Sequence, residues 1–188
     1  MKIPITIIFF ILFSLFNTIL LAQEKSNICF ELSRPIIEKS IFDRYLLDFG
    51  TGYNYHFKQI YFGCEFTTLY SKLRYSGNDT KTFILKPNIN ISYPINPTSK
   101  ICIEPKLGCG YSFIIINSDK YELTDYQQGV CTLVEFKINY QNNAKFDYYM
   151  IISHDYIHLK KDVSFTQLNY YRNMHLMRIG IGLILKFD

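Results

Sequence analysis

The chain has 188 residues, of which 48% are hydrophobic and 17% aromatic, with 16 Tyr, 16 Phe and no Trp. Its 20 basic and 16 acidic side chains leave a formal net charge of +4, which is too small to predict a polyanionic partner, so we expect no nucleic acid. The length fits one domain. After the N-terminal segment, no apolar run reaches the roughly 18 residues of a membrane helix, which excludes a helical membrane bundle.

The N-terminal segment, 1–22, has the composition of a secretory signal peptide. Lys2 is followed by a largely apolar run that ends at Ala22, and several polar residues interrupt that run. The alternative is an uncleaved membrane anchor, which these polar residues disfavour. We predict cleavage near Ala22 or Gln23, which leaves 23–188 as the mature domain.

The rest of the sequence alternates between apolar and polar residues, the pattern of strands with two different faces. The last segment shows it best, because six apolar residues from Met177 to Phe187 alternate with glycines and with Arg178 and Lys186. Most of the segments exceed the roughly 9 to 11 residues that a tilted strand needs to cross a bilayer. The expected strands are 27–33, 43–57, 60–74, 82–93, 100–116, 126–140, 144–157 and 175–187.

Short and long connections between these segments also alternate. In small membrane barrels, short turns face the periplasm and longer loops face outside. The pattern therefore predicts an all-β fold, an eight-stranded antiparallel up-and-down transmembrane barrel with both ends on the periplasmic side. The short turns are 58–59, 94–99 and 141–143, and the longer loops are 34–42, 75–81, 117–125 and 158–174.

Three prolines fall in or beside the expected strands and lack the amide hydrogen that a strand ladder uses. We expect Pro35 to interrupt the first strand early. Pro87 and Pro105 lie inside the fourth and fifth strands, where a bulge would shift the alternation of the residues that follow.

The faces of the strands predict an apolar exterior and a charged interior. An eight-stranded barrel is just wide enough for side chains to fill it, and buried charges are tolerated when they are paired. We therefore expect an ion-pair network that closes the lumen. Its expected members are Glu31, Arg44, Asp48, Glu65, Lys86, Glu104, Lys106, Glu135, Lys137, Asp147, Arg178 and Lys186.

A second group of polar residues lies at one rim. His154, Tyr156 and His158 share the outward face of the seventh strand, and His175 begins the eighth. Such a group can bind a metal or a lipid phosphate, or serve an outward-facing enzyme. The neighbouring serine and aspartate of the same strand face the other way, so a nucleophile is missing. We favour polar interface residues, with no metal and no cofactor.

The five cysteines are an odd number with no zinc-binding spacing. We expect small strand residues without disulfides. They are Cys29, Cys64, Cys102, Cys109 and Cys131.

These features together resemble the small outer-membrane β-barrel domain family of Gram-negative envelopes. The likeness rests on 21–23 at the end of the signal, on 50–55, on 105–111 and on Phe187 in the closing strand. It implies an outer-membrane location, contact with outer-membrane lipid, and insertion by the barrel assembly machinery.

The resemblance leaves the function open, since one fold serves many roles. We favour a non-enzymatic structural or interaction element that contacts an envelope or extracellular protein through the four longer loops. The alternatives are a conduit for small or apolar solutes, a secreted lipocalin-like binding barrel, and an outward-facing lipid-modifying enzyme. A lipocalin would need the many aromatic rings inside a barrel too narrow for them.

Overall fold

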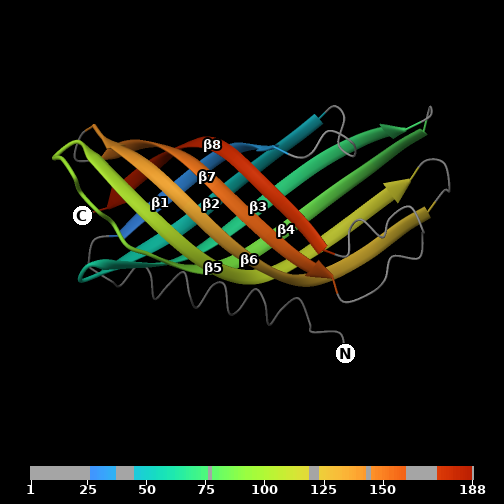
Figure 1. The fold of residues 1–188 in the computed structure, drawn as a ribbon, viewed down its shortest axis with the longest axis horizontal. Helices are drawn as coiled ribbons and strands as arrows, with labels where there is room; N and C mark the ends of the chain where they lie inside the picture. Colours follow the sequence, from blue (N-terminus) through green and yellow to red (C-terminus); the bar gives the residue numbers. More distant parts are fainter. Residues whose placement is uncertain are drawn as a thin grey trace.

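The structure is a computed structural model that describes residues 26–36, 45–75, 78–118, 123–142, 145–159 and 173–187. Eight antiparallel strands form a closed barrel in which each strand pairs with the next and β1 pairs with β8 (Figure 1). The predicted all-β, eight-stranded fold is thus confirmed. The strands are β1 (Ser26–Ile36), β2 (Tyr45–Phe57), β3 (Ile60–Tyr75), β4 (Asn78–Ser92), β5 (Ile101–Ser118), β6 (Leu123–Gln141), β7 (Phe146–Leu159) and β8 (Asn173–Phe187).

Some sequence predictions concern residues outside these ranges. The signal peptide 1–22, the lumen residue Arg44 and most of the loops 34–42 and 158–174 lie outside the described residues and stay predictions. Within the described ranges, no helix is long and apolar enough to cross a membrane.

The register of the eight ladders fixes the tilt of the strands. Stepping from each residue to its cross-strand partner leads once around the barrel. A circuit that starts at Ser26 of β1 returns to β1 at Ile36, ten residues further along. With about 3.3 Å per residue and about 4.8 Å between strands, this offset gives a tilt of roughly 41° and a backbone radius of roughly 8 Å. The circuit passes through Tyr55, Phe62, Ile91, Leu107, Val134, His154 and Met177.

The two internal prolines interrupt hydrogen bonds without adding a bulge. Pairing of β4 with β5 stops after Leu85 and resumes at Asn88 in the same register, so Pro87 leaves the alternation unchanged. Pro105 accepts a hydrogen bond from the Tyr93 amide at 3.1 Å, just past the end of β4. Pro105 has no amide hydrogen to donate, but the residue opposite it lies past the end of β4, so no hydrogen bond to β4 itself is lost.

The expected interruption of the first strand at Pro35 is wrong, because β1 continues to Ile36. Its pairing with β2 ends at Ser33, whereas its pairing with β8 runs to the last residue. Pro35 thus lies beyond the β2 ladder, where a strand tolerates the loss of a donor.

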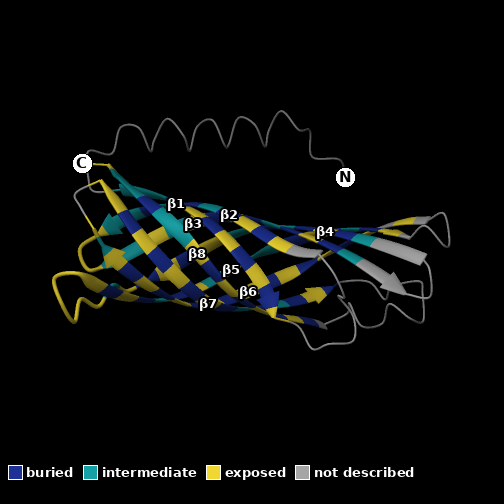
Figure 2. Cartoon of the chain, turned by 90° about the horizontal axis from the view of Figure 1, so that it is seen from above, coloured by how far each residue is buried: buried dark blue, intermediate teal, exposed yellow. Residues whose placement is uncertain are grey.

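Side chains alternate between the lumen and the exterior along every strand, as Figure 2 shows in the chequered pattern of buried and exposed residues. On β8 the exterior is apolar from Phe187 to Met177, ten residue steps along the strand. At the tilt given above these steps span roughly 25 Å, which is the height of the apolar band of outer-membrane barrels. Aromatic residues such as Phe57, Tyr93 and Tyr148 are exposed near the short turns, which the sequence analysis expects on the periplasmic side.

Four strands continue beyond the mouth of the barrel. β3 and β4 stay paired to Tyr75 and Asn78, and β5 and β6 stay paired to Ser118 and Leu123. Within the described residues, the pairing of β6 with β7 ends at Gly129 and Leu159, so β3 to β6 form a wall that extends past the other strands (Figure 1). The expected loops 75–81 and 117–125 are therefore wrong in extent, since most of their residues belong to hairpins.

Candidate functional site in the lumen

Ten of the twelve predicted lumen residues are buried inside the barrel. Lys186 lies at the periplasmic end, where its side chain is 32% exposed, and Arg44 lies outside the described residues. The buried ten come from every strand of the barrel. They are Glu31, Asp48, Glu65, Glu104, Glu135, Asp147, Lys86, Lys106, Lys137 and Arg178.

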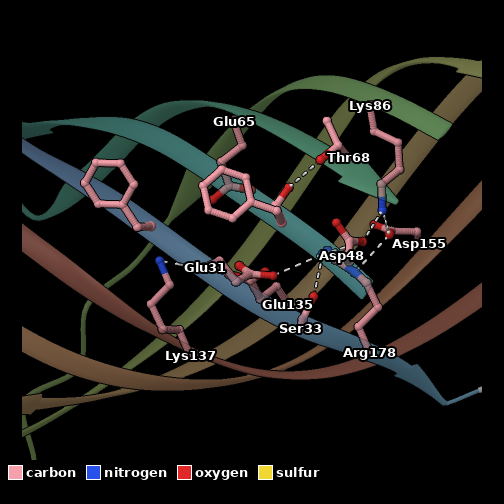
Figure 3. Close-up of polar contacts among 12 residues, drawn as sticks. Glu31, Ser33, Asp48, Glu65, Thr68, Lys86, Glu135, Lys137, Asp155 and Arg178 are labelled. Atoms are coloured by element: carbon pink, nitrogen blue, oxygen red, sulfur yellow. Dashed lines mark hydrogen bonds and ion pairs between the residues drawn. The ribbon is translucent and has the colours of Figure 1, made fainter. Parts of the chain in front are cut away.

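The first ion-pair group is the Arg178 cluster, which consists of Arg178, Lys86, Glu31, Asp48 and Asp155. Arg178 Nη1 lies 3.1 Å from Glu31 Oε1 and 3.2 Å from Asp48 Oδ2, while its Nε lies 3.0 Å from Asp155 Oδ2. Lys86 Nζ lies 3.1 Å from Asp48 Oδ2 and 2.6 Å from Asp155 Oδ2. Figure 3 shows both cations directed toward the two aspartates from opposite walls.

The second group, the Lys106 cluster, lies nearer the periplasmic end and consists of Lys106, Lys137, Glu65, Glu104 and Glu135. Lys106 pairs with Glu65 and lies 2.8 Å from Glu135 Oε1. Lys137 Nζ lies 3.8 Å from Glu104 Oε1 and 4.0 Å from Glu135 Oε1. Both lysine side chains are at most 1% exposed, so these charges are compensated by protein groups rather than by bulk water.

Neutral polar groups support the Lys106 cluster. Glu104 accepts hydrogen bonds from Ser92 Oγ at 2.7 Å and from Asn139 Nδ2 at 3.1 Å. The Lys137 ammonium lies 4.7 Å from the ring centroid of Tyr149, a cation–π distance. The Tyr149 hydroxyl donates to the Phe30 carbonyl at 3.0 Å, which fixes the ring in the lumen.

Asp155 is the residue of the network that sequence reasoning omitted from the predicted set. It is 2% exposed and contacts both Arg178 and Lys86. Its inward position follows from the alternation along the seventh strand, where His154 and Tyr156 point outward, so the signal was present in the sequence.

The extracellular half of the lumen carries an apolar layer that the sequence analysis did not find. On β5 the run from Phe113 to Ile116 is apolar at every position, so alternation gives no sign of which face is buried. In the structure Ile114 and Ile116 point inward and are at most 2% exposed. The layer consists of Leu69, Ile84, Ile114, Ile116, Cys131, Ile157, Leu159, Met174 and Leu176.

The histidine rim comes together in part. His154 Nε2 lies 3.2 Å from His175 Nδ1, and the Tyr156 ring lies 4.9 Å from the His175 ring between centroids. His158 faces Asn173 of β8 instead, one step further toward the outside. Within the described ranges, no group of three or more His, Cys, Asp or Glu side chains is placed to hold a metal ion.

All five cysteines are free. Cys64 and Cys109 are exposed on the outer face, and Cys29, Cys102 and Cys131 are buried in the lumen, as the alternation predicts. The cysteines therefore act as small strand residues, and no disulfide links them.

Comparison with known proteins shows which solved structures have a similar fold. No protein-family model matches the chain, and no curated protein matches it in sequence. Among solved structures it is similar to Ail, the attachment invasion locus protein of Yersinia pestis, with 14% identity, a TM-score of 0.56, and coverage of 87% of this chain and 99% of that chain.

Two further solved structures have the same likeness. Neisserial surface protein A is 13% identical with a TM-score of 0.54, covering 87% of this chain and 95% of that one. The outer membrane protein OprG of Pseudomonas aeruginosa is 11% identical with a TM-score of 0.53, covering 88% and 97%. Together with the closed topology and the apolar exterior, these likenesses show that the chain has the fold of the small eight-stranded β-barrels of the Gram-negative outer membrane.

Proposed function

We propose that this chain is an integral outer-membrane barrel with a closed lumen, which serves the envelope as a structural or interaction element through its extracellular end. The observation that carries the proposal is the filling of the lumen by two ion-pair clusters and one apolar layer. A barrel of this radius has room for side chains and little else.

Energetics support a closed lumen over a conduit. A continuous water path past the Arg178 cluster requires Arg178 or Lys86 to leave its carboxylates, and breaking a buried ion pair costs about 3 to 5 kcal/mol. The Lys106 cluster adds a second barrier in series. The apolar layer beyond both clusters adds a third barrier, in which apolar side chains outnumber buried polar neighbours such as Thr82 and Gln127.

The extracellular end supplies the surface through which we expect the protein to act. The wall of β3 to β6 projects past the barrel mouth, and Tyr126 on it is 70% exposed. Exposed aromatic residues on a rigid sheet are suited to protein contacts. The neighbour Ail has been solved with the heparin analogue sucrose octasulfate, so this fold is compatible with extracellular ligands.

The same proposal assigns the partners. Outer-membrane lipid covers the apolar band, the barrel assembly machinery inserts the chain, and an envelope or extracellular protein contacts the connections at 34–42, 75–81, 117–125 and 158–174. The proposal includes no catalysis.

Conductance in planar bilayers tests the closed lumen. We expect no unitary currents from the refolded barrel, because the two ion-pair clusters and the apolar layer close its lumen. Well-resolved currents from the unaltered chain would overturn the closed lumen. For the extracellular role, the binding of envelope or extracellular protein is measured on cells that display the unaltered chain and on cells that display a chain with shortened connections 119–122 and 160–172. Equal binding to both would contradict the extracellular role.

A further inference from the structure

The outward faces of β7 and β8 bring two imidazole nitrogens together at the outer edge of the apolar band. His154 Nε2 and His175 Nδ1 lie 3.2 Å apart, although the two residues are 21 positions apart in the sequence. We propose that His154 and His175 form a two-histidine site for a divalent transition-metal ion on the outer rim of the barrel.

The separation of the nitrogens fits two ligands of one ion. Imidazole nitrogens bind zinc at about 2.0 to 2.1 Å in tetrahedral geometry, which places two of them about 3.3 to 3.4 Å apart. The observed 3.2 Å, a hydrogen bond between the two rings, is slightly shorter than this separation. The planes of the rings are tilted by 35° to each other, and an ion would take the place of the hydrogen that the two nitrogens share.

The sheet holds the two rings in this relation. His175 is the cross-strand partner of Tyr156, and His154 is the partner of Met177, so the histidines are diagonal neighbours within reach of aromatic side chains. The Tyr156 ring lies against the His175 ring, with 4.9 Å between the centroids and 46° between the planes, and limits the rotation of that imidazole. A pre-positioned pair loses little entropy when it binds an ion.

The location determines how open the site is. Met177 is the last apolar residue of the band on the outward face of β8. His175 is the next residue beyond it on that face, and its side chain is exposed. Two protein nitrogens leave the other coordination positions to water. Neutral imidazole suits zinc, copper and nickel, and among these copper(II) binds most tightly in the Irving–Williams order.

Copper(II) binding to the refolded barrel in detergent micelles tests the site. The background carries Cys64→Ser and Cys109→Ser, because these exposed thiols react with copper(II). We expect one copper per barrel and an electron paramagnetic resonance spectrum with coupling to two nitrogens. His154→Gln or His175→Gln should each weaken binding roughly a hundredfold, the advantage of two linked ligands over one.

Two histidine variants serve as controls. His56→Gln removes a ring that lies 4.7 Å from the Tyr61 ring between centroids, at the opposite end of the barrel, and His158→Gln removes the next histidine on the same face of β7. Both should keep the two-nitrogen spectrum. Copper should also raise the urea concentration that unfolds the unaltered barrel, because the ion links β7 to β8, and should not do so for His154→Gln.

The proposal fails if the double variant of His154 and His175 binds copper as tightly as the unaltered barrel. It also fails if His158→Gln removes binding as completely as His154→Gln does, because the ion then sits elsewhere on the rim. Heat-modifiable gel mobility shows that each variant compared is a folded barrel.

Discussion

Replacement of Arg178 by methionine is the most direct test of the lumen network. Arg178 is 1% exposed and reaches three carboxylates, those of Glu31, Asp48 and Asp155. Methionine fills much of the same space without a charge, so Asp48 and Asp155 are left with Lys86 as their cation and Glu31 loses its pair with Arg178. Removal of one partner from a buried network costs about 3 to 5 kcal/mol. The equilibrium constant for unfolding should rise by roughly two to four orders of magnitude.

The matched control is Lys186→Met, which removes a lysine that is 32% exposed and pairs with Asp147 at 2.7 Å. Because solvent reaches the Lys186 side of this pair, its removal should cost less than the removal of Arg178. The chain has no Trp, so urea unfolding in lipid vesicles is followed by gel mobility and far-ultraviolet circular dichroism. Adding Asp155→Asn to Arg178→Met should restore part of the lost stability, since it removes one uncompensated charge.

Equal free energies of unfolding for Arg178→Met and Lys186→Met would refute this reasoning. So would a further loss of stability when Asp155→Asn is added. Either result would mean that water, and not the protein, solvates the centre of the lumen.

Three further substitutions, two of them with a control substitution, test other parts of the barrel. Gly182→Ala should prevent stable folding, because a Cβ at this position overlaps an aromatic ring of β7. A Cβ at Gly108 has its nearest atom at 3.2 Å, so the control Gly108→Ala should fold. Heat-modifiable gel mobility distinguishes the two outcomes. Ile181→Arg in the apolar band should cost about 2 to 4 kcal/mol in lipid vesicles, and Tyr126→Arg on the wall almost nothing. Ile114→Ala in the apolar layer should lower the free energy of unfolding by about 2 to 5 kcal/mol.

The sequence predicted the strands and their faces because alternation is a local signal. Met177 to Phe187 on the outside and Arg178 on the inside follow from the period of two alone. Closure between β1 and β8 followed from the even number of strands and the alternating connection lengths.

Features that depend on other strands were missed. Asn78, Asp79 and Thr80 have the composition of a loop, yet all three pair with β3, and Thr80 also pairs with β5, so they are part of a strand. Tertiary context overrides local propensity at such sites. The apolar layer was missed for a related reason, because Ile114 and Ile115 are chemically the same and only packing distinguishes the buried one.

The ten-residue offset of the barrel has a consequence for length changes in the chain. The circuit from Ser26 meets β1 again at Ile36 on the same face. One residue inserted into any strand would therefore move every later side chain of that strand to the opposite face of the barrel wall. Charges would then enter the lipid and apolar groups the lumen. Insertions and deletions are therefore confined to the connections, and diversification in length has room chiefly on the side that faces the surroundings of the cell.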